Sequence, residues 1–322
     1  MKTLVLSMIS IAATVAAMTA CTSESDPINE VVNPKDAKVE IKLNAGVSSI
    51  STKAAIESDA SGNPSSNVEH VFLYKQEGNT EPTWGSANLG NAIGVTINND
   101  GKIDFGANTQ YYPVDGKNVY FIGYHTGSTT AETPATGNKI PVTITGVEDV
   151  LYANSINAGK RGDVTAVPKM KFKHLLTQIK FTLQKDANVT GDISVTSIKI
   201  TQASEAGLNT TFNMSLADGA LSDWAGTTSE IVVTNVPTGN LTTNASSSTD
   251  GVLLQPEATS ITIEVTSASF PDSKLTTKIN GVTAGVFKAG TSYTIALTVK
   301  DKSVSGSASI EQWKDENGSG EL

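Results

Sequence analysis

The chain has little of several residue types on which catalytic and metal-binding chemistry usually depends. Its 322 residues include one cysteine, Cys21, one arginine, Arg161, and three histidines. A single cysteine excludes disulfides within the chain and metal sites built from several thiolates. The near absence of arginine, with a formal net charge of −9, argues against binding to nucleic acid or to anionic membrane. We therefore expect no nucleic-acid partner.

The sequence also lacks the motifs that identify common enzymes. His70, His125 and His174 are not spaced as metal ligands, and no H-E-x-x-H, G-x-S-x-G or glycine-rich phosphate loop is present. His70 and His174 lie inside apolar strand segments and are interpreted as packed residues. A catalytic pair of Asp or Glu residues, as in glycosidases, stays an alternative, because the two acids of such a pair need not lie close together in the sequence. We expect no enzymatic activity, no metal and no cofactor.

Two short segments resemble binding motifs without satisfying them. Residues 98–104 (NNDGKID) suggest a calcium loop, but the matching EF-hand register puts Thr96 and Ala107 at the first and twelfth positions, where acidic ligands are required. The Asp100-Gly101 dipeptide predicts a tight turn there instead. Arg161-Gly162-Asp163 matches the integrin-binding tripeptide, but a motif of three residues often occurs by chance.

The N-terminus has the pattern of an export signal. Lys2 precedes an uncharged, largely apolar run over 4–18, which is short for a membrane span and typical of a signal peptide. The run ends in Thr19-Ala20-Cys21, and small residues before a cysteine resemble the lipobox of bacterial lipoproteins. We predict a signal peptide over 1–20 and acylation, such as palmitate, at Cys21. Ordinary secretion with an incidental cysteine is the alternative.

The remaining residues predict a flexible tether followed by strands. The tether covers 21–36, which contains two prolines, several acids and few large apolar residues. Beyond it, apolar residues recur with a period of two, as expected for half-buried strands. The clearest runs are Val39/Ile41/Leu43, Ile140/Val142/Ile144, Phe212/Met214/Leu216, Ile261/Ile263/Val265 and Tyr293/Ile295/Leu297/Val299.

Turn signals between these runs favour an all-β fold of the sandwich type. Without the predicted signal peptide, the chain is still longer than a single hydrophobic core usually supports, so two domains are expected. The segment 159–168 contains glycine and charge without a strand pattern. We place the boundary there, with an N-terminal β-sandwich domain over 37–165 and a C-terminal one over 166–322.

Several segments, in order, resemble the fimbrillin family of Bacteroidetes, the subunits of type V pili. The lipoprotein start is the first, and VEIKLNAG followed by ISTKAA (50–55) is similar to the family's first strand and basic processing site. DVLYA (149–153) and KFKHLLTQIKFTL (171–183) resemble the succession D-L-x-x-A … F-x-H-x-L-x-K/Q-I-x-F. The closing stretch 287–320 resembles the family's A-G-x-x-Y turn, final strand pair and lone tryptophan.

The resemblance implies two transthyretin-like β-sandwich domains in tandem. It also implies a structural subunit of a bacterial surface pilus (fimbrium), exported as a lipoprotein to the cell outer membrane and serving cell adhesion. Proteolysis after a basic residue, here Lys53, would remove the strand with Val39, Ile41 and Leu43. Lys42 is a poorer choice because it lies within that strand. Strand exchange with other pilus subunits would follow, as β-augmentation allows.

Two alternatives remain open at this stage. Without cleavage the chain would be an anchor or a surface relative that does not polymerise. A cell-surface glycan-binding lipoprotein is the second, because Trp84, Trp224 or Trp313 could stack on a sugar, although such residues more often fill the core. In either case the partners are the membrane lipid at Cys21 and a host or bacterial surface ligand.

Lipidation at Cys21 can be tested directly. Cells labelled with a clickable fatty acid should incorporate the label into the parent protein and not into Cys21→Ala, because the chain has no other thiol to accept a lipid. In-gel fluorescence of the two immunoprecipitated proteins measures the difference. Equal labelling would contradict the prediction.

Overall fold

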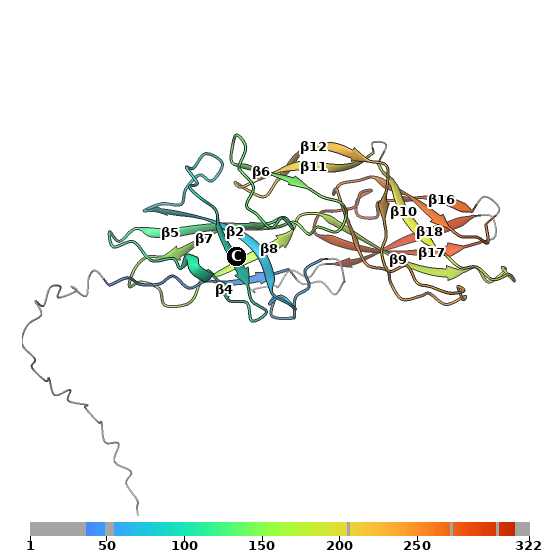
Figure 1. Cartoon of the computed structure of the whole chain (residues 1–322), viewed down its shortest axis with the longest axis horizontal. Helices are drawn as coiled ribbons and strands as arrows, with labels where there is room; N and C mark the ends of the chain where they lie inside the picture. The colour runs from blue at the N-terminus through green and yellow to red at the C-terminus, as the bar shows by residue number, and fades with distance from the viewer. Residues whose placement is uncertain (1–36, 49–54, 205–206, 271–272, 301–302, 313–322) are drawn as a thin grey trace, which may run out of the picture. The chain divides into compact units, whose positions relative to one another are not determined.

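The computed structural model describes residues 37–48, 55–204, 207–270, 273–300 and 303–312 (Figure 1). Within these ranges the regular structure is β-strand apart from one short 3₁₀ turn, Gly106–Asn108. No helix in this part of the chain has the length and apolar character needed to cross a membrane. The prediction of an all-β fold is confirmed.

Four sheets make up the fold, and the largest has seven strands. Its order is β1 (Asn44–Val47), β8 (Lys169–His174), β7 (Leu151–Gly159), β5 (Asn118–His125), β2 (Val68–Gly78), β3 (Ile93–Ile97) and β4 (Ile103–Asp104). The three-stranded sheet has the order β12 (Leu221–Thr228), β11 (Leu208–Ser215) and β6 (Lys139–Thr143).

The two remaining sheets have four strands each. One has the order β13 (Ile231–Val232), β10 (Ser197–Ala203), β15 (Ser260–Thr266) and β16 (Lys274–Asn280). The other has the order β14 (Val252–Leu254), β9 (Thr177–Lys185), β17 (Thr291–Val299) and β18 (Val304–Gln312). β9 and β17 pair in parallel over nine residues, and β17 and β18 form an antiparallel hairpin.

Four of the five period-two runs follow strands, and their alternate side chains are buried. The run Val39/Ile41/Leu43 differs, because it precedes β1 in extended chain with one isolated bridge, between Glu40 and Tyr111. Ile140, Val142 and Ile144 are at most 4% exposed, and the runs beginning at Phe212, Ile261 and Tyr293 are buried in the same way. The predicted turn at Asp100-Gly101 joins β3 to β4, with Gly101 at a φ of 79° that glycine adopts without strain. These sequence predictions are confirmed.

The apolar side chains form three clusters. One lies between the two four-stranded sheets and includes Phe181, Ile263 and Tyr293. A second lies on one face of the seven-stranded sheet and includes Phe121 and Phe172. The third lies between the opposite face of that sheet and the three-stranded sheet.

The third cluster joins the two halves of the sequence. Tyr74 and Tyr124 enter it from β2 and β5, whereas Phe212, Met214 and Leu253 enter it from the later strands. β6 pairs with β11, and residues 38–322 form one compact unit. The division into domains 37–165 and 166–322 therefore stays a prediction.

A glycine in the middle of β5 tests the tight packing of the seven-stranded sheet. A methyl group at Gly123 would come within 2.7 Å of Leu73 and 2.9 Å of Phe172. We expect Gly123→Ala to lower the free energy of unfolding by roughly 1–3 kcal/mol through overpacking. Gly191→Ala, where the added methyl meets nothing within 4 Å, is the matched control and should be close to neutral. Chemical denaturation measures both, and equal stability of the two variants would refute this packing.

Candidate functional site

The candidate site is the N-terminal segment Val39–Ser48 and the groove that holds it. Cys21 and Lys53, the predicted lipidation and processing residues, lie outside the described residues. Of the predicted strand residues, Ile41 and Leu43 are buried at 0% and 2% exposure, whereas Val39 is 38% exposed. The burial continues at Ala45 and Val47, so alternate side chains of this segment enter the second cluster.

One edge of the segment is hydrogen-bonded to residues 101–112. The amides of Ile41 and Ala45 donate to the carbonyl oxygens of Gln110 (2.8 Å) and Gly101 (2.7 Å). In return, the carbonyl oxygen of Leu43 accepts from Ile103 (3.0 Å), and that of Val39 accepts from Tyr112 (2.9 Å). Ile103 opens β4, the last strand of the seven-stranded sheet.

The other edge of the segment is paired with β8. β1 runs parallel to β8, with Asn44 opposite Lys169 and Val47 opposite Phe172. The amides of Asn44 and Ser48 donate to Pro168 and Phe172 at 2.9 Å and 3.0 Å. The segment thus supplies one edge strand of the seven-stranded sheet, β1, and bonds to the β4 region at the other edge, which closes that sheet on itself.

Cavities on both sides mark the borders of the groove. One of about 300 Å³ lies between Leu43, Phe105 and Val167, and one of about 280 Å³ lies between Val47, Gly62 and Phe172. The segment therefore fills the groove without sealing its rims.

A buried ion pair lies where the segment ends. The Nδ1 atom of His174, at the end of β8, is 2.8 Å from Oδ2 of Asp149, and the two side chains are 0% and 3% exposed. His174 Nε2 lies 3.0 Å from the carbonyl oxygen of Ser48, and Asp149 Oδ2 accepts from the amide of Ile56 at 2.9 Å. The apolar neighbours of His174 in the sequence predict packing alone. His174 is buried, as predicted, and it also makes polar contacts with Asp149 and Ser48.

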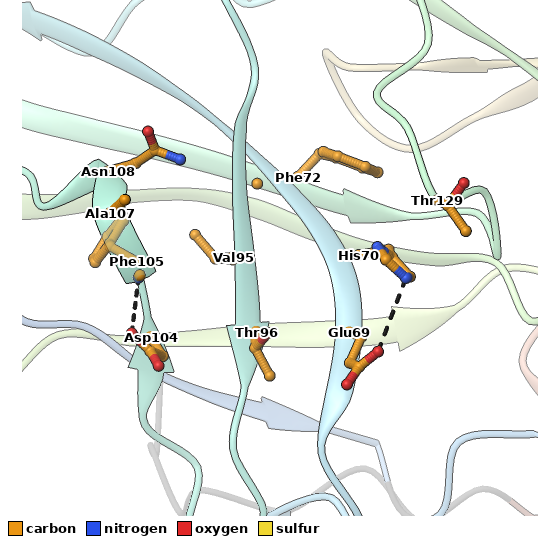
Figure 2. A pocket seen from close by; sticks show the side chains of 12 residues that line it. Glu69, His70, Phe72, Val95, Thr96, Asp104, Phe105, Ala107, Asn108 and Thr129 are labelled. Carbon is orange, nitrogen blue, oxygen red and sulfur yellow. Dashed lines mark hydrogen bonds and ion pairs between the residues drawn. The ribbon is translucent and has the colours of Figure 1, made fainter.

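The interpretation of His70 as a packed residue is wrong. Its side chain is 43% exposed, and its backbone has a φ of 56° at a bulge where β2 shifts register against β3. His70 and Glu69 line an open pocket of about 370 Å³ together with Phe72 and Phe105 (Figure 2). Asp104 reaches the same pocket, but its Oδ1 already accepts from the amide of Gly106 at 2.8 Å.

His125 lies beneath the backbone of this bulge. Its Nδ1 is 3.2 Å from the carbonyl oxygen of His70. Burial lowers the pKa of His125, which favours its neutral form. Across the described residues, no group of three or more histidine, cysteine, aspartate or glutamate side chains could hold a metal ion.

The tryptophans place limits on the glycan-binding alternative. Trp84 is 4% exposed inside the third cluster, so its ring is covered by protein. Trp224 is half-buried, with its ring centroid 4.2 Å from that of Phe212. Trp313 lies outside the described residues. The indole of Trp84 is therefore not available to a sugar, and that of Trp224 is partly covered by Phe212.

Truncation of the segment should show which of its side chains stabilise the fold. We expect Leu43→Ala to lower the free energy of unfolding by about 2–5 kcal/mol, since it empties a buried site. Val39→Ala, at the exposed end of the same segment, should change it by less than about 0.5 kcal/mol. Denaturant titration of both variants checks this, and a Val39 effect as large as that of Leu43 would contradict the assignment.

Comparison with solved structures shows the fold. Two proteins described as "putative cell adhesion protein" match, one from Bacteroides uniformis and one from Bacteroides ovatus. The first is 21% identical, with a TM-score of 0.57 over 85% of this chain and 99% of that chain. The second is 16% identical, with a TM-score of 0.52 over 87% and 100%. A fimbrial protein from Bacteroides vulgatus is 18% identical, with a TM-score of 0.51 over 85% and 99%.

The family comparison covers most of the described chain. No curated protein sequence matches it. The fimbrillin-like family model matches residues 52–313, which include all strands from β2 to β18. The chain therefore belongs to the fimbrillin-like family.

Proposed function

We propose that this protein is a non-enzymatic structural subunit of a bacterial surface fimbria that serves adhesion. Membership of the fimbrillin-like family supports this role, as do similar structures described as fimbrial or cell adhesion proteins. Export as a lipoprotein through Cys21 would bring the subunit to the outer membrane. Its partners would be other pilus subunits, the membrane lipid and a surface ligand.

The observation that carries the proposal is the closure of the seven-stranded sheet by Val39–Ser48. This segment is held by backbone hydrogen bonds on both edges and by alternate buried side chains. Lys53 follows shortly after it in the sequence. Cleavage after Lys53 would therefore leave the closing strand attached to the domain by noncovalent contacts alone.

Departure of that strand would create a site for a strand of another subunit. Each backbone group left buried without a partner costs about 1–3 kcal/mol, and the vacated groove would have such groups along both edges. A strand from a neighbouring subunit would satisfy them and fill the pockets of Ile41 and Leu43, which is assembly by β-augmentation.

The donor strand is a further part of the proposal. β18 pairs with β17 over its whole length, and within the described chain it is the end strand of its sheet. Val304 is buried in the first cluster, whereas Ile310 is 44% exposed. β18 is therefore a candidate donor that would have to leave β17 first.

Proteolysis of the purified protein tests the model. After treatment with a trypsin-like protease, the parent should form ladders on unboiled gels, and Lys53→Ala should stay monomeric because the closing strand stays covalently attached. Lys42→Ala is the matched control, since Lys42 is an exposed lysine within the same segment, and it should ladder like the parent.

Either of two results would contradict the processing model. One is laddering of Lys53→Ala to the same extent as the parent. The other is a parent that stays monomeric although mass spectrometry confirms the cut after Lys53. In the second case the anchor and non-polymerising alternatives gain support.

A further inference from the structure

The Asp149–His174 pair contacts the chain on both sides of the proposed cut. His174 Nε2 meets the carbonyl oxygen of Ser48, the last described residue before the cut. Asp149 Oδ2 accepts from the amide of Ile56, which follows the cut. One buried pair therefore binds the two pieces into which cleavage after Lys53 would divide the chain.

The chemistry of the contacts defines how the pair is bonded to the backbone. A backbone carbonyl oxygen only accepts hydrogen bonds, so Nε2 of His174 donates to the carbonyl oxygen of Ser48. Asp149 accepts from the amide of Ile56 and is hydrogen-bonded to Nδ1 of His174. The two buried side chains therefore link the backbone on one side of the proposed cut to the backbone on the other.

We propose that Asp149 and His174 form a latch that retains the cleaved N-terminal segment until an incoming strand replaces it. The inference rests on the proposed function for its biological meaning. If Ser48 leaves, the Nε2–H of the buried His174 loses the carbonyl oxygen that accepts from it, and the loss of that hydrogen bond in a buried place is costly. An incoming strand lifts that cost only when it places a carbonyl oxygen where that of Ser48 was, so the latch also favours one register of the new strand.

The surroundings of the pair allow such an exchange. A cavity of about 650 Å³ lies beside it, lined among others by Ile56, His125 and Asp149.

Release of the N-terminal fragment after cleavage is the quantity to measure. The purified full-length protein is cut after Lys53, and fragment dissociation is followed by size exclusion with mass spectrometry at a concentration too low for assembly. We expect His174→Gln and the isosteric Asp149→Asn to release the fragment at least about tenfold faster than the parent. His125→Gln is the matched control and should behave like the parent, because His125 bonds to the His70 carbonyl and to neither end of the cut.

The outcomes separate the latch from the processing model. Release from His174→Gln and Asp149→Asn at the parent's rate would overturn the latch and leave processing untouched. If all variants release the fragment as expected and none of them ladders, the latch stands and polymerisation by strand exchange fails.

Discussion

The backbone pairing of Val39–Ser48 is the constraint on which the N-terminal half of the fold depends. A sheet with two free edges leaves unpaired amides and carbonyls, and closing the sheet on itself removes both edges at once. Here one short segment bonds to β8 on one side and to the β4 region on the other. The second apolar cluster lies inside the closed sheet, so its exclusion from water depends on the same segment. A single strand therefore completes both the hydrogen bonding and the core.

The two kinds of contact along this segment have different consequences. Apolar contacts of Ile41 and Leu43 are nondirectional and would accept other side chains of similar size. Backbone pairing is directional but does not read sequence, so any strand of the right length could reproduce it. The Asp149–His174 pair differs from both, since it needs an acceptor at one point in space. Fixing register is the best-attested role of buried polar groups in otherwise apolar contacts.

The sequence predicts the strands better than their partners. Period-two runs such as Phe212/Met214/Leu216 identify strands because alternation is a local property of the pleat. The parallel pairs β1–β8 and β9–β17 join segments more than 100 residues apart, and no local pattern encodes that pairing. The pairing of β6 with β11, across the predicted domain boundary, is equally nonlocal. His70 was misjudged because apolar neighbours suggest burial, whereas a bulge turns its side chain outward.

The candidate site, too, is predictable from the sequence only in part. Ile41 and Leu43 are predictable from alternation, and the likeness to fimbrillins supplied Lys53 from a basic residue after the first strand. The contact between Asp149 and His174 is not predictable from the sequence, because the two residues are 25 positions apart and each lies in a segment with a strand pattern. Their role becomes visible only when Ser48 and Ile56 are placed beside them. If the segment is exchanged as proposed, its contacts must be strong enough to hold it and specific enough for another strand to reproduce. A buried pair at its end meets both needs, because the Nε2–H of His174 requires an acceptor at the position of the Ser48 carbonyl oxygen.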